Sequence, residues 1–143
     1  MVIDHPIFLE SIRFIRSRLV ANDLNYLEIK VLERLVHTSG DFTVQTLLNF
    51  SEGACEKGLQ ALKNGAPILT DTDMAAAAIK SMAENTTINK VFTASMWFGK
   101  NNHTNLTKTA YGLSEGWKEL SAINSGSKSP IVCLLYTSPS PRD

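Results

Sequence analysis

Residues 65–74, Gly-Ala-Pro-Ile-Leu-Thr-Asp-Thr-Asp-Met, decide the fold class of this chain. The segment 66–70 is short and apolar and ends in a threonine, which is typical of a buried parallel strand at the point where the next loop begins. The acidic turn that follows, from Asp71 to Asp73, can cap the alanine-rich helix that continues to Met82. A buried strand that leads directly into a helix is the repeating unit of an α/β domain.

The same alternation continues toward the C-terminus. Residues 90–96 predict a second strand, 108–123 a helix and 131–135 a third strand. We therefore expect an α/β fold with a mainly parallel sheet flanked by helices. Because ligands of such sheets gather beyond the carboxyl ends of the strands, Thr70, Asp71 and the loop after the second strand lie where a site is expected.

Helical patterns precede the first strand. Asp4, followed by a proline at position 6, indicates an N-cap region, and apolar residues then recur at helical spacing as far as residue 19. A second helix is expected over 26–38, ended by a left-handed cap at Gly40. Its predicted apolar face holds Leu27, Val31, Leu32 and Leu35.

Two further helices are expected before the strand. Asp41 can cap a short third helix, and a fourth begins after Ser51 and stops at Gly65. The side chains predicted to face inward on this fourth helix are Ala54, Cys55, Leu59 and Leu62.

Composition excludes several functional classes. The formal net charge is +0 with no run of like charge, which disfavours a nucleic-acid or membrane-surface partner. Two cysteines, Cys55 and Cys133, lie far apart and outside any metal-ligand spacing, so we expect neither a disulfide scaffold nor a metal site. Charges in every turn of the first helix interrupt a signal-peptide core, and together these features favour the cytoplasm.

Three features are candidates for chemistry. Arg34 and His37 lie three residues apart and share a helix face, where histidine can give or take a proton. From spacing alone the other interpretation is favoured, in which His37 is a cation that complements the negative end of a helix. Asp71 can bind a substrate or cap a helix. Lys108 can meet an anionic substrate or be an ordinary solvated lysine, and His103 lies in a polar loop that suggests no specific role.

These pieces occur in an order that resembles the precorrin-8X methylmutase family. The resemblance rests on His-Pro at 5–6 with Glu-Ser at 10–11, on Arg-x-x-His-x-x-Gly-Asp at 34–41, on Gly-Ala-Pro-Ile-x-x-Asp-x-x-Met at 65–74, and on Thr-Lys-Thr-Ala at 107–110. Each motif alone is weak, but four of them in order between about residue 4 and residue 131 form a specific pattern.

The resemblance implies an α/β homodimer and an isomerase that uses no cofactor. Such an enzyme moves a methyl group from carbon eleven to carbon twelve of a corrinoid and gives hydrogenobyrinate, or cobyrinate when cobalt is present. In that role His37 would donate and accept the proton, while Ser11, Arg34, Asp71 and Lys108 would bind the substrate. A guanidinium suits the carboxylate side chains of a corrinoid.

The chain departs from the family pattern at several positions. Lys108 stands where an arginine is usual, which keeps the charge but loses the bidentate geometry, and Ile12 replaces a common aromatic residue. Family members continue further, whereas residues 133–143 include a Ser-Pro-Ser-Pro run that does not suit a buried sheet. We therefore expect 1–132 to be the N-terminal part of a single methylmutase domain and 133–143 to be a non-native tail. A sheet that is incomplete at its C-terminal side is expected to be marginally stable.

Two other functions remain open at this stage. A non-catalytic corrinoid-binding module would use His37 and Arg34 to hold a tetrapyrrole without transforming it. A nucleotide-binding α/β protein is disfavoured, because the sequence has no glycine-rich phosphate loop.

Overall fold

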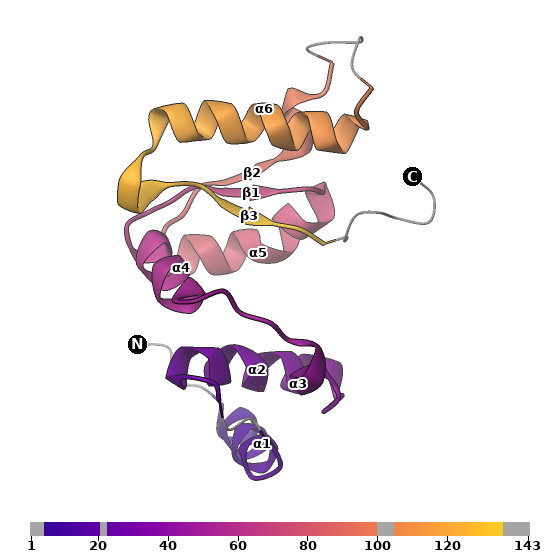
Figure 1. The fold of residues 1–143 in the computed structure, drawn as a ribbon, viewed down its shortest axis with the longest axis vertical. Coiled ribbons are helices and arrows are strands. Elements are labelled where there is room, and N and C mark those ends of the chain that lie inside the picture. The colour runs from indigo at the N-terminus through magenta and orange to yellow at the C-terminus, as the bar shows by residue number, and fades with distance from the viewer. Residues whose placement is uncertain (1–4, 21–22, 100–104, 136–143) are drawn as a thin grey trace. The chain divides into compact units, whose positions relative to one another are not determined.

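The computed structural model describes residues 5–20, 23–99 and 105–135, and it divides into two compact units, Met1–Glu56 and Lys57–Asp143. The first unit contains α1 (Pro6–Arg16), α2 (Tyr26–Ser39) and α3 (Val44–Leu47), and α4 (Ala54–Lys63) begins there and continues into the second. The second unit then has, in order, β1 (Ile68–Thr70), α5 (Asp73–Asn85), β2 (Val91–Thr93), the 3₁₀ helix η1 (Ala94–Trp97), α6 (Lys108–Ile123), the 3₁₀ helix η2 (Gly126–Lys128) and β3 (Ile131–Cys133) (Figure 1).

The sheet of the second unit has three parallel strands in the order β2-β1-β3. Ile68 of β1 pairs with Val91 on one side and with Ile131 on the other. Helix α5 covers one face of the sheet and α6 covers the other (Figure 1). All three residues of β1 are buried, as expected for a strand covered on both faces, and the structure confirms the predicted α/β class with a parallel sheet.

The second strand is shorter than predicted. It ends at Thr93, because residues 94–97 turn into η1 instead of continuing the extended chain to residue 96. This turn brings Trp97 into the core with Leu69 and Leu120, and the indole N–H donates a hydrogen bond to Glu119 Oε2 at 2.8 Å. The third strand likewise ends at Cys133, two residues short of its predicted end.

Threonine hydroxyls cap both long helices of the second unit. The Thr72 hydroxyl accepts the amide N–H of Ala75 at the start of α5, and the Thr107 hydroxyl accepts that of Ala110 at the start of α6. The carboxylate of Asp71 is therefore not the cap of α5. At the start of α1 the cap is His5, whose Nδ1 accepts the Ile7 amide at 3.3 Å, while Asp4 lies outside the described residues.

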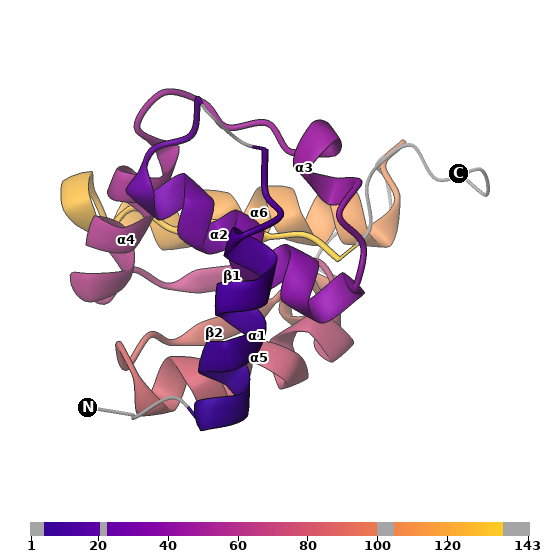
Figure 2. The same ribbon diagram turned by 90° about the horizontal axis from the view of Figure 1, so that it is seen from below.

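Helices α1 and α2 cross in the first unit (Figure 2) and bury a core of Ile12, Ile15, Leu32 and Val36. The predicted apolar face of α2 was partly wrong, because Val31 and Leu35 are about two-fifths exposed. The buried face is centred instead on Leu32, Glu33 and Val36. The predicted left-handed cap at Gly40 is confirmed by its φ of 69°.

Glu33 is the polar member of that buried face. Its carboxylate accepts Arg16 Nε at 2.6 Å across the helix crossing and Lys30 Nζ at 3.2 Å along α2. Burial raises the pKa of the Glu33 carboxyl, but hydrogen bonds from both cations outweigh that effect and leave the pKa below its ordinary value. The charged form of Glu33 therefore holds α1 to α2.

Two details of the remaining helices differ from expectation. Asp41 does not cap α3, since Thr43 is the cap residue and the Asp41 carboxylate accepts the Thr43 amide N–H at 2.8 Å. In α4, Ala54 and Leu59 are exposed rather than inward, and no residue of this helix is buried. Its apolar side chains belong to neither of the two hydrophobic cores described above. The inward-facing side that the sequence predicts for this helix is therefore not matched by burial.

Two glycines allow α6 to approach η1 closely. A Cβ on Gly112 would lie 2.3 Å from the carbonyl oxygen of Ala94, and one on Gly116 would lie 2.9 Å from the Trp97 ring. A backbone oxygen cannot move aside as a side chain can, so the constraint at Gly112 is the stricter of the two. In α4, by contrast, a Cβ on Gly58 would meet nothing within 4 Å.

We predict that Gly112→Ala destabilises the second unit by about 1–3 kcal/mol, because overpacking against backbone exceeds the gain in helix propensity. The matched control, Gly58→Ala, should stabilise the chain by up to about 1 kcal/mol, since it adds helix propensity without a clash. Urea denaturation followed by circular dichroism measures both. Equal stability of the two variants would contradict the close packing of α6 on η1.

We predict that Glu33→Gln destabilises the first unit by about 1–3 kcal/mol at neutral pH, because it removes the charged acceptor of two hydrogen bonds. The folded pKa of Glu33 is lowered, so its contribution is present above the unfolded value of about 4.5 and is lost as pH falls through the folded pKa. Denaturation curves at a series of pH values should show the wild type losing its advantage over the variant in acid. Glu10→Gln on the exposed surface of α1 is the control, and it should show no such convergence.

Candidate functional site

His37 and Arg34 meet on one aromatic ring. Phe8, from the first turn of α1, lies with its ring centroid 4.9 Å from that of His37, and the two ring planes are nearly perpendicular at 86°. The Arg34 guanidinium carbon lies 4.1 Å from the centroid of the same Phe8 ring. The structure thus brings together two of the five predicted site residues, through a third residue that the sequence did not single out.

The last turn of α2 holds these side chains on a well-defined backbone. The hydroxyls of Thr38 and Ser39 donate to the carbonyls of Arg34 and Leu35 at 2.9 and 2.8 Å, and the Gly40 amide donates to Val36. The Gly40 bond gives a partner to the Val36 carbonyl, which is one of the last four of the helix, whereas the two hydroxyl bonds add to carbonyls inside the helical ladder. His37 and Arg34 are both exposed, so their side chains extend from this turn into solvent.

Ser11 lies in the same unit, on α1. It is half-buried and follows Phe8 by three residues, which places the two on one helix face, about one turn apart. The structure thus places Ser11 one turn along α1 from the ring that His37 and Arg34 share.

Asp71 and Lys108 belong to the second unit. Asp71 follows β1, is 6% exposed, and accepts the Leu135 amide N–H on Oδ2 at 2.9 Å, while its own amide donates to Cys133. This carboxylate ties the end of β1 to the chain that follows β3. Lys108 is exposed at the first position of α6.

Polar side chains cluster beside the carboxyl ends of β1 and β2, where Thr70 was expected but the contact between Asp73 and Ser95 was not. Ser95 donates its hydroxyl to Asp73 Oδ1 at 2.8 Å, and Thr70 donates to the carbonyls of Thr72 and Phe92. Hydrogen bonds from Ser95 and then Thr93 hold the pKa of Asp73 below its usual range. The signal was hidden because Ser95 lies in the turn of η1, which the sequence predicts as strand. His103, in the loop named as part of this edge, lies outside the described residues.

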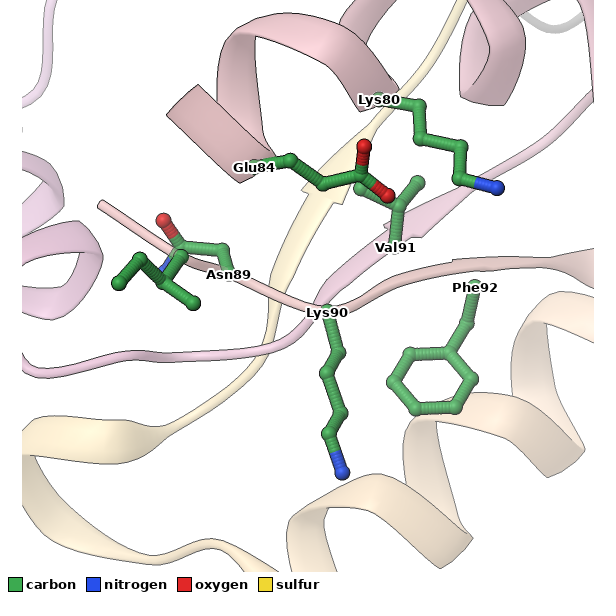
Figure 3. A pocket seen from close by; sticks show the side chains of 7 residues that line it. Lys80, Glu84, Asn89, Lys90, Val91 and Phe92 are labelled. Carbon is green, nitrogen blue, oxygen red and sulfur yellow. The ribbon is translucent and has the colours of Figure 1, made fainter. Parts of the chain in front are cut away.

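A pocket of about 360 Å³ lies at the other end of β2. Its lining residues are Lys80, Glu84, Ile88, Asn89, Lys90, Val91 and Phe92. Figure 3 shows Val91 on the side of Lys80 and Glu84 from α5, whereas Lys90 and Phe92 point to the opposite side of the strand. The lining includes none of the five predicted site residues.

Within residues 5–20, 23–99 and 105–135, no cluster of three or more His, Cys, Asp or Glu side chains could hold a metal ion. Over the same ranges no helix combines the length and apolar character needed to cross a bilayer. The chemistry available near α2 is that of an imidazole beside a guanidinium. Such a pair can transfer a proton and bind a carboxylate at adjacent positions.

Comparison with known proteins gives one consistent answer. A family model described as precorrin-8X methylmutase matches residues 6–125. A cobalt-precorrin-8 methylmutase from Synechocystis is 26% identical over 106 residues, which covers 64% of this chain and 49% of that protein. A protein of the same name from Methanocaldococcus jannaschii is 36% identical over 59 residues, covering 41% of this chain and 28% of its own length.

A solved structure agrees with these relatives. The precorrin-8x methyl mutase from Thermus thermophilus superimposes with a TM-score of 0.65 and 27% sequence identity, over 79% of this chain and 55% of that one. The chain thus spans about half the length of the Synechocystis and Thermus thermophilus proteins. The match of the family model covers α1 to α6, including His37, Arg34, Ser11, Asp71 and Lys108. The chain belongs to the precorrin-8X methylmutase family.

Proposed function

We propose that this protein is an isomerase of cobalamin biosynthesis that moves a methyl group on a corrinoid macrocycle, giving hydrogenobyrinate or cobyrinate. The observation that carries the proposal is the pairing of His37 and Arg34 on the Phe8 ring, at an exposed helix end inside the family match. The names of the relatives support the same reaction class.

The chemistry assigns a distinct role to each side chain. His37 donates a proton to the macrocycle, which weakens conjugation at the migrating centre and favours the shift, and then takes the proton back. Arg34 binds a substrate carboxylate through its planar fork, one helical turn from the imidazole. Ser11 adds a hydroxyl donor from α1.

For Asp71 and Lys108, which belong to the second unit, we propose substrate binding as well. Lys108 binds an anionic group as a point charge, without the bidentate geometry of arginine. Asp71 accepts the Leu135 amide on Oδ2, so in this proposal it would bind the substrate through its other carboxylate oxygen. A corrinoid ligand, a homodimer and a cytoplasmic location belong to the same proposal.

We predict that His37→Ala lowers methylmutase turnover by about 10²–10⁴-fold, the usual contribution of a general acid–base residue, and leaves corrinoid binding nearly unchanged. Absorption titration with substrate and product measures binding, and product formation in the same samples measures turnover. Wild-type protein that binds the corrinoid without converting it would instead favour a non-catalytic binding module.

We predict that Arg34→Lys weakens corrinoid binding about tenfold, because an ammonium cannot reproduce the bidentate pairing with a carboxylate. The matched control is Arg13→Lys, the same substitution at an exposed position of α1, which should leave the titration unchanged. Similar losses in both variants would show that the effect comes from general charge and not from the site.

A further inference from the structure

Phe8 is the residue through which the two chemical groups of α2 are connected. Its ring contacts the His37 ring at 4.9 Å and lies 4.1 Å from the Arg34 guanidinium carbon. No sequence motif marked this residue, since it is one apolar position among several in an amphipathic helix. In the structure, however, Phe8 contacts both His37 and Arg34.

We propose that Phe8 is a positioning residue for the proposed reaction: its ring fixes the His37 imidazole and the Arg34 guanidinium in one mutual arrangement. The inference rests on the proposed function for its catalytic meaning. Its structural content concerns the side-chain conformations of α2 and can be tested without a corrinoid.

The rotamer of His37 is the first requirement for such a role. His37 is exposed, and an exposed histidine side chain normally samples several staggered rotamers. A proton donor and a carboxylate binder that act on one ligand must keep a fixed separation, because misplacement of a reacting group by about 1 Å can cost 10²-fold in rate. A shared rigid contact restricts both side chains before the ligand arrives.

The Phe8 ring is itself held in place by its surroundings. Phe8 is half-buried and packs against the core of Ile12, Ile15, Leu32 and Val36. Its backbone lies in the first turn of α1, which the His5 side chain caps. An aromatic ring has only two side-chain torsions, so anchoring on this core leaves it little freedom.

The two contacts of the Phe8 ring are directional. The near-perpendicular arrangement with His37 is a preferred geometry of aromatic pairs, and a guanidinium near the ring is attracted by the negative face of the π system. Both contacts depend on the aromatic ring and not merely on its volume. Leucine at position 8 would fill much of the same core space without reproducing either contact.

Phe8→Leu, Phe8→Tyr and the wild type are compared by NMR with the His37 ring and Hβ protons assigned. In the wild type and in Phe8→Tyr we expect ring-current shifts of the His37 imidazole protons and coupling constants of a single χ1 rotamer. Phe8→Leu should lose the shifts and show rotamer-averaged couplings. If its His37 shifts and couplings equal those of the wild type, the positioning role is overturned.

Phe14→Leu is the matched control, because it makes the same substitution on α1 at a ring that contacts Arg18 instead, with the Arg18 guanidinium carbon 4.3 Å from its centroid. It should leave the His37 signals unchanged, and circular dichroism of all variants checks that α1 and α2 remain folded. Should Phe8→Leu lose the fold, Phe8→Tyr against the wild type still decides, since altered His37 couplings in this conservative variant would overturn the proposal.

Kinetics then separate this inference from the proposed function. Where the wild type turns over precorrin-8X, Phe8→Leu should lower kcat by about 10- to 100-fold with a smaller change in KM, and Phe8→Tyr should restore it. An unchanged kcat in Phe8→Leu would overturn the positioning role, even if the wild type shows the expected ring-current shifts of His37. If the wild type neither binds nor converts the corrinoid, the proposed function fails, while the NMR comparison still decides whether Phe8 orders His37.

Discussion

The contact between α1 and α2 depends on a buried carboxylate. Glu33 has a side chain that is 2% exposed, and its charge is retained because Arg16 of α1 and Lys30 of α2 both donate to it. An unpaired carboxylate at this depth would be strongly disfavoured, so the helix crossing and the ion pairs require each other. The ring of Phe8 contacts His37 and Arg34 from α1. Both contacts therefore depend on the crossing of α1 and α2.

The second unit relies on a constraint of another kind, the close approach of backbones. Gly112 and Gly116 remove two side chains from the face of α6 that meets η1, and this places the Trp97 ring against Leu69 of β1 and Leu120 of α6. Trp97 then reaches Glu119 with its one polar atom, so the indole is buried without an unsatisfied donor. The short turn of η1 that makes this possible also directs Ser95 toward Asp73 at the edge of the sheet.

Much of this could be predicted from the sequence, and the failures share a cause. The bounds of α6, the parallel sheet and the left-handed cap at Gly40 follow from local signals, namely helical periodicity, a buried apolar run and a glycine after a helix. The buried face of α2 did not follow, because a pattern of apolar residues cannot reveal that Glu33 is drawn inward by a cation on another helix. The shortened β2 is a similar case, since the turn at residue 94 is stabilised by tertiary packing of Trp97.

The same limit applies to the candidate site: local sequence patterns predicted some of its residues, and tertiary contacts revealed the others. The spacing of Arg34 and His37 placed both on one face of α2, but nothing in the sequence distinguished Phe8 from its apolar neighbours in α1. Asp71 was recognised as the end of a strand, yet its partner Leu135 lies 64 residues away and belongs to the segment expected to be non-native. Whatever the origin of that segment, Cys133 is paired with Thr70 in the sheet.

The position of Lys108 at the start of α6 bears on its proposed role. It occupies the first turn of α6, where the partial positive charge of a helix N-terminus disfavours a cation, and no acidic residue in that turn offsets the cost. A lysine placed there for stability alone would be a poor choice, whereas a residue that binds an anionic group would gain from the helix end as well as from its own charge. In the proposed role, Lys108 would therefore combine its own charge with that of the helix end, without the bidentate geometry of an arginine.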